Sequence, residues 1–126
     1  SERELYLALA DWYEDPLQVS QAAETWLFIA QRAPLSEDAP TLSARAVRVY
    51  REAGFERLAF ETSRQLVDAY GPRSEFWLHH EKRGYPEELR LIDDCLIKLG
   101  SYYHQQSIDA PGLEYDQMAE RYYRDY

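Results

Sequence analysis

Cysteine is nearly absent from this sequence. Cys95 is the only one, so the chain cannot form an internal disulfide bond or a cluster of thiolate metal ligands. Glycine and proline are also few, with five and six residues, which argues against a disordered or loop-rich chain. Long apolar runs are missing too, because the stretch at residues 26–30 is far shorter than the roughly 20 residues that cross a bilayer.

Basic residues are fewer than acidic residues in this sequence. The chain has 14 basic residues against 23 acidic ones, a net charge of −9 and a pI near 4.8. Nucleic-acid binding needs clustered Lys and Arg to displace counterions, and the basic residues here are scattered. We therefore expect a protein or peptide partner, with no nucleic-acid binding and no direct membrane insertion.

Enough apolar material is present for one folded domain. Of the 126 residues, 45% are hydrophobic, and 11 Tyr and 3 Trp supply much of that fraction. We expect a single domain over residues 1–126. Because the sequence starts without a leader and ends within a helical pattern, we also expect it to be a fragment of a longer protein.

Apolar residues recur at helical spacing along the chain, and no segment alternates as a half-buried strand does. The spacing predicts helices over 4–13, 20–32, 41–53, 56–70, 87–107 and from about 114 onward. Glu14-Asp15-Pro16, Gly54 and Gly71-Pro72 are predicted to separate them. Residues 73–86 are predicted to form a loop, or a loop with one turn of helix, partly packed through Trp77. The predicted inward-facing residues are Ala22, Ala23, Trp26, Ile29, Ala30, Ala46, Val49, Tyr50, Ala59, Phe60, Leu66, Val67, Tyr70, Leu89, Ile92, Leu96, Leu99 and Tyr103.

The helices come in pairs with an internal similarity. A shift of about 37 residues sets Tyr13 over Tyr50 and Ala22 over Ala59. Small residues at such positions let two helices approach closely, and aromatic residues fill the space between neighbouring hairpins.

The first of these units resembles a tetratricopeptide (TPR) repeat. The matching residues of its two helices are Tyr6, Leu9, Ala10, Tyr13, Ala22, Trp26 and Pro34. The second unit departs from the pattern at Ser43 and Ser63, where aromatics are usual. The resemblance implies an all-α solenoid of about three helix-turn-helix repeats, at about 3–36, 40–72 and 87–126, stacked as a right-handed superhelix. It also implies a protein-binding role without catalysis or a cofactor.

A narrower similarity is to TPR proteins of the Gram-negative envelope. It is carried by Ala69-Tyr70-Gly71, Phe76-Trp77, the stretch at 99–104 and the tyrosines between Tyr115 and Tyr123. This similarity implies a scaffold in a bacterial cell-envelope assembly, periplasmic or associated with the outer membrane, with the cytoplasm left open.

The TPR resemblance also implies a concave groove lined by the first helix of each pair. The usual groove positions correspond here to Leu7, Asp11, Glu14, Ala44, Arg48, Arg51, Ile97, Ser101 and His104. The Lys/Asn clamp that holds a free C-terminal carboxylate is replaced by Leu7 and Asp11, so we expect a segment of mixed charge instead. Self-association stays an alternative.

Residues with catalytic or metal-binding chemistry do not form a motif. His79-His80-Glu81 lacks HExxH spacing, and adjacent imidazoles point in different directions, so we interpret the pair as an exposed loop pair. We interpret His104 as a solvated groove residue and Cys95 as a small buried one. No catalytic, cofactor or metal site is predicted.

Three hypotheses follow for the function. The first is the protein-binding scaffold, and the second is a non-catalytic helical accessory domain of a larger enzyme. The third is binding of a small molecule or sugar by the aromatic faces. The C-terminal tyrosines fit either repeat packing or a binding surface, and they are Tyr115, Tyr122, Tyr123 and Tyr126.

Overall fold

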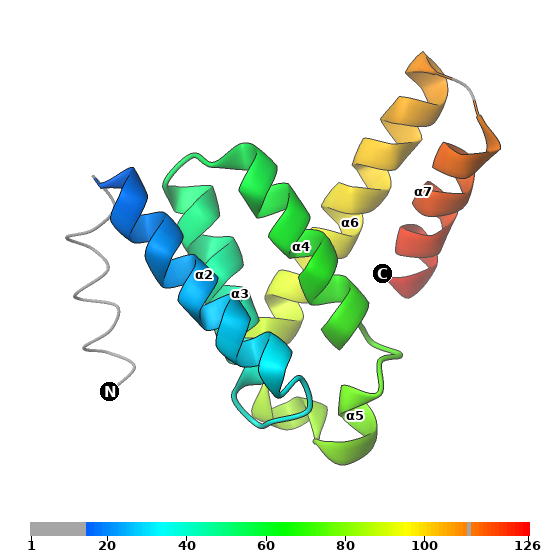
Figure 1. The fold of residues 1–126 in the computed structure, drawn as a ribbon. Helices are drawn as coiled ribbons and strands as arrows, with labels where there is room; N and C mark the ends of the chain where they lie inside the picture. Colours follow the sequence, from blue (N-terminus) through cyan, green and yellow to red (C-terminus); the bar gives the residue numbers. More distant parts are fainter. Residues whose placement is uncertain (1–14, 111) are drawn as a thin grey trace. The chain divides into compact units, whose positions relative to one another are not determined.

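A computed structural model describes residues 15–110 and 112–126 of the chain. Every regular element in these residues is helical, which confirms the all-α prediction (Figure 1). The chain divides into two compact units, which we call unit 1 (residues 1–63) and unit 2 (residues 64–126), with the boundary inside helix α4. The helices are α2 (Pro16–Arg32), α3 (Ala39–Glu52), α4 (Glu56–Tyr70), α5 (Phe76–His79), the short 3-10 helix η1 (Lys82–Gly84), α6 (Pro86–Asp109) and α7 (Leu113–Asp125).

Helix α2 begins four residues before the predicted start at Ser20. Pro16 occupies the first turn, where its missing N–H is no loss because that donor has no helical partner anyway. The Asp15 carboxylate accepts hydrogen bonds from the backbone N–H groups of Leu17 and Gln18, at 3.0 and 3.4 Å. Asp15-Pro16 is therefore a helix start rather than an interruption.

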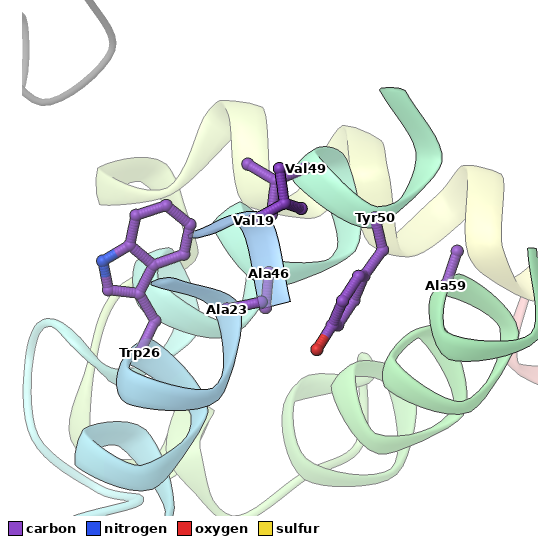
Figure 2. Packing of buried hydrophobic residues seen from close by; sticks show 7 residues of the cluster. All are labelled: Val19, Ala23, Trp26, Ala46, Val49, Tyr50 and Ala59. Carbon is purple, nitrogen blue, oxygen red and sulfur yellow. The ribbon is translucent and has the colours of Figure 1, made fainter. Parts of the chain in front are cut away.

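Unit 1 is built on the hairpin of α2 and α3, which lie side by side in Figure 1. Small side chains such as Ala23 and Ala46 are fully buried and let the two helices approach closely. The prediction that Ile29 faces inward is wrong, because its side chain is 49% exposed, while Val19 takes a core position instead. Figure 2 shows the core cluster: Val19, Ala23, Trp26, Ala46, Val49, Tyr50 and Ala59.

A glycine turn joins α3 to α4. Gly54 has a φ of +82°, the left-handed conformation predicted for this position. The backbone N–H of Phe55 then donates to the carbonyl of Tyr50 at 2.9 Å, and the ring of Phe55 lies 6.0 Å from that of Tyr50. The turn thus closes the carbonyl end of α3 and packs against the core of unit 1.

In unit 2, α4 and α6 are joined by a connector that contains α5 and η1. The Trp77 indole N–H lies 3.0 Å from the carbonyls of both Tyr70 and Gly71, which confirms that Trp77 packs the loop onto the end of α4. Phe76, in the connector, is only 1% exposed, although it was not among the predicted inward-facing residues. Its ring contacts those of Tyr70, Trp77, His80 and Tyr85.

Helices α6 and α7 form the second hairpin, with α7 running back along α6 (Figure 1). Four of the five predicted inward residues of α6 are buried, and Leu89 is half-buried. Gly100 permits the close approach of the helices, because a Cβ there would lie 2.7 Å from the ring of Tyr123. Cys95 is fully buried, as predicted.

Candidate functional site

The outer face of α2 carries large exposed apolar side chains. Leu17 and Phe28 are 66% and 59% exposed, and Ile29 lies beside them. Residues 17, 21, 24 and 28 follow one side of the helix, on the face opposite the buried stripe that starts at Val19, because positions two apart differ by about 200°. We call Leu17, Gln21, Glu24, Phe28 and Ile29 the α2 outer face. Opposite its packed stripe, helix α2 therefore presents two large apolar side chains, Leu17 and Phe28, with the polar Gln21 and Glu24 between them.

The α2 outer face also carries charge. Glu24 is exposed between Leu17 and Phe28 in the stripe, and the guanidinium of Arg32 lies 5.4 Å from the centre of the Phe28 ring. Such a cation–π contact holds the exposed ring in place from one end of the helix. The face therefore combines two apolar anchors with a carboxylate between them.

Three arginines, at positions 45, 48 and 51, follow one another along α3. Each is half-buried and interacts with other residues of the chain. Arg48 and Arg51 are the groove residues expected from the TPR resemblance, so part of their surface is already used within the protein. Ala44, which was also expected in the groove, is fully buried and cannot line a surface.

In unit 2, side chains from the last turns of α4 meet tyrosines and an arginine of α6 and α7. We call Arg64, Asp68, Tyr103, Arg121 and Tyr122 the Arg64 cluster. The rings of Tyr103 and Tyr122 stack with their centres 5.8 Å apart. Arg121 donates to the Asp68 carboxylate at 2.9 Å and lies 5.4 Å from the centre of the Tyr122 ring.

The titration of the Arg64 cluster reflects burial and this concentration of charge. Interaction with the Tyr122 hydroxyl raises the pKa of Arg64, and Asp68 adds to the rise. Burial raises the pKa of Tyr103, although the nearby Arg64 guanidinium opposes that rise. The arginine is thus held in its charged form beside the phenol of Tyr103, whose proton is held more tightly than in water.

The prediction that His79 and His80 are both exposed is correct for His79 and wrong for His80. His79 is exposed and lies 3.8 Å from the Glu75 carboxylate. His80, however, stacks on Phe76 with ring centres 4.1 Å apart, and its edge faces Tyr85. The reason is that α5 ends at His79 and the backbone of His80 is extended, so one imidazole points to solvent and the other enters the aromatic cluster.

The remaining predicted groove residues differ in their accessibility. Ile97 is half-buried, whereas Ser101 and His104 are exposed on α6. The Ser101 hydroxyl is 3.2 Å from that of Tyr123, so it takes part in the hairpin. Leu7, Asp11 and Glu14 lie outside the described residues.

Other candidate sites in the described part of the chain are weak. An open hollow of about 550 Å³ lies at the start of α4, lined by Phe55, Glu56, Arg57, Leu58 and Glu61. Its Arg57 and Glu61 form an ion pair at 3.4 Å. Within residues 15–110 and 112–126, no three His, Cys, Asp or Glu side chains are grouped as metal ligands, and no helix is both long and apolar enough to span a membrane.

The C-terminal tyrosines divide between the two interpretations. Tyr122 is buried and Tyr115 half-buried, and both stack on Tyr103, as expected for packing. Tyr123 and Tyr126 are exposed, at 39% and 64%, and they keep the binding interpretation open.

Comparison with protein-family models, curated proteins and solved structures finds no match to this chain.

Proposed function

We propose that the chain is a protein–protein interaction scaffold and that the α2 outer face binds an apolar, basic segment of a partner protein. The observation that carries this proposal is the exposure of large apolar side chains on α2 outside its packed stripe. The packed stripe contacts α3, whereas Leu17, Phe28 and Ile29 are exposed to solvent. Large exposed side chains of this kind, rimmed by polar residues, are typical of interaction surfaces.

The charge of the chain favours a basic partner. Two copies of this protein would each bring a net charge of −9, so their approach is opposed electrostatically. Glu24 lies between the two apolar anchors of the α2 outer face. A partner helix with Lys or Arg between two apolar residues is complementary to that arrangement.

The biological setting of the proposal comes from the TPR resemblance. A solenoid of TPR-like repeats uses helices with apolar side chains on more than one side, and α2 has this property. A role in a bacterial envelope assembly, periplasmic or at the outer membrane, is proposed on the resemblance alone.

The test combines affinity capture with measured affinities. The chain is used as bait in separate envelope and cytosolic extracts, each retained protein is purified, and its Kd is determined for wild type and for Leu17→Ser with Phe28→Ser. We expect the double substitution to weaken binding by about tenfold or more, because buried aromatic and aliphatic anchors carry most interface energy. Glu24→Lys should weaken it as well, with a reduced association rate.

Matched controls separate this surface from others. Leu78→Ser removes an equally apolar side chain that is 81% exposed in unit 2, and it should leave the Kd unchanged. The variant Arg48→Glu with Arg51→Glu tests the groove expected from the TPR resemblance. Circular dichroism first shows whether this variant folds, and its Kd is then compared with that of wild type. A variant lacking residues 1–14 tests whether that segment competes with the partner for the α2 outer face. If it does, the deletion should lower the Kd. Equal Kd values for wild type and the α2 double variant would refute the proposal.

A further inference from the structure

Apolar and charged side chains follow a fixed order along the exposed side of α2. Leu17 comes first and is followed by Glu24 and Phe28, and Arg32 ends the series with its guanidinium 5.4 Å from the centre of the Phe28 ring. All four side chains are exposed, and they lie within about 80° of one another around the helix axis. In residues 15–110 and 112–126, neither Glu24 nor Arg32 forms an ion pair. Both charges are therefore available to a partner.

The spacing of the two apolar anchors selects the conformation of the partner. Leu17 and Phe28 are eleven residues apart in α2, which separates them by about 16 Å along the axis and about 20° around it. A second helix reproduces this separation with two apolar residues that are eleven positions apart. An extended strand does not, because its residues on one face are about 13 Å apart at four positions and about 20 Å apart at six. The two anchors therefore match a helix better than an extended peptide.

The charges select the direction of the partner helix. When the partner runs antiparallel to α2, its N-terminal part brings an acidic residue to Arg32 and then an apolar residue to Phe28. A basic residue follows at Glu24, and a second apolar residue reaches Leu17. The acidic residue then lies toward the N-terminus of the partner helix and the basic residue toward its C-terminus, which suits the dipole of that helix. A parallel partner has the opposite order, and its dipole points the same way as that of α2.

We propose that the α2 outer face binds an amphipathic helix antiparallel to α2, in which an acidic residue is followed by an apolar residue after four positions, a basic residue after eight and a second apolar residue after fifteen. This inference rests on the proposed function and adds the conformation, direction and residue pattern of the partner. The two apolar residues cover Leu17 and Phe28, which are 66% and 59% exposed. The basic residue pairs with Glu24, and the acidic residue pairs with Arg32 beside the Phe28 ring.

The experiment titrates the isotope-labelled whole chain with synthetic peptides of about 20 residues, long enough to form a helix, and follows the binding by NMR at constant ionic strength. The designed peptide carries Glu, Leu, Lys and Leu at the four positions in a background of alanine and glutamine. One control moves the second leucine by two positions, which turns it to another side of the helix, and the other reverses the order of the four residues. The designed peptide should bind about tenfold more tightly than the shifted control and about threefold more tightly than the reversed one, with shifts in α2 and none in α7.

A charge swap assigns the central contact. Glu24→Lys should raise the Kd of the designed peptide about threefold, and a peptide with Glu in place of its lysine should recover that loss. Glu120→Lys makes the same change of charge at an exposed position of α7 and should leave the Kd unchanged. Equal Kd values for the designed and shifted peptides, tighter binding of the reversed peptide, or a charge swap without recovery would overturn the inference. If a captured partner depends on Leu17 and Phe28 while the designed peptide has no advantage, only this inference fails and the proposed function stands.

Discussion

Units 1 and 2 bury different kinds of side chain. The core of unit 1 consists mainly of alanine and valine on two regular helices, with Trp26 and Tyr50 at its sides. Unit 2 buries the aliphatic stripe of α6 and, in addition, more rings: Phe76 with its neighbours in the connector, and Tyr103 with Tyr122 in the hairpin. Small side chains suffice where helices run close together, whereas an irregular connector leaves spaces that only large rings fill.

This difference has a chemical consequence. A tyrosine brings a hydroxyl and an ionisable proton into the core, and a valine does not. Unit 2 therefore contains buried phenols and a stacked histidine, while the described part of unit 1 buries the phenol of Tyr50 and the small hydroxyls of Ser43, Thr62 and Ser63. The following predictions test this comparison, from the largest expected effect to the smallest.

Phe76→Ala should destabilise unit 2 by about 3–5 kcal/mol, because it removes the ring that joins four others. The matched change in unit 1, Val49→Ala, should cost only about 2 kcal/mol. Hydrogen exchange read by peptide locates each loss, with α6 and α7 affected most in the first variant and α2 and α3 in the second. Equal losses of protection in the same helices would contradict the comparison.

Alkaline pH should weaken unit 2 through Tyr70. Burial raises the pKa of Tyr70 from 10.0 to about 12, so the folded state holds the phenol proton more tightly than the unfolded state does. The resulting stability is fully present below pH 10 and is lost as the pH rises through 12, to a total of about 2–3 kcal/mol. Denaturant unfolding of wild type and Tyr70→Phe at pH 9 and pH 12 measures it.

The control for Tyr70 is its counterpart in unit 1. Burial, aided by Glu24, also raises the pKa of Tyr50, so Tyr50→Phe should remove part of the alkaline loss in that unit. A pH dependence that is the same in wild type and in Tyr70→Phe would show that the Tyr70 phenol titrates as in water.

Gly54→Ala should destabilise unit 1 by about 1 kcal/mol. No atom lies within 4 Å of the position that the new Cβ would take, so the cost comes from the positive φ alone. Gly84→Ala in unit 2 meets equally open space without a positive φ, and it should change the unfolding free energy by less than about 0.5 kcal/mol. Thermal unfolding of both variants measures the difference, and equal costs would rule out the backbone explanation.

The sequence predicted the regular part of the fold well. The spacing of Ile92, Leu96 and Leu99 was enough to assign α6, and Gly54 was correctly predicted to adopt a left-handed turn. Proline was misread at position 16, because the same residue begins one helix as readily as it ends another. The capping carboxylate of Asp15 was the signal that would have corrected it.

The candidate sites were much less predictable. Trp26 was correctly predicted to face inward, but Ile29, assigned to the same side, is 49% exposed, because local spacing does not show which residues at the edge of a stripe meet another helix. His79 and His80 are neighbours with opposite surroundings for the same reason. The Arg64 cluster joins residues more than 50 positions apart, a distance over which a periodic pattern carries no information.

By itself, the sequence determined that this chain is helical, acidic and unable to form an internal disulfide bond, and it set where most helices begin and end. These properties depend on residue type and on interactions within a few positions, which can be read along the chain. Only the tertiary structure decided which side of α2 is left to solvent and which tyrosines meet an arginine. Both features depend on which helices pack together, and residues far apart in the sequence decide that packing.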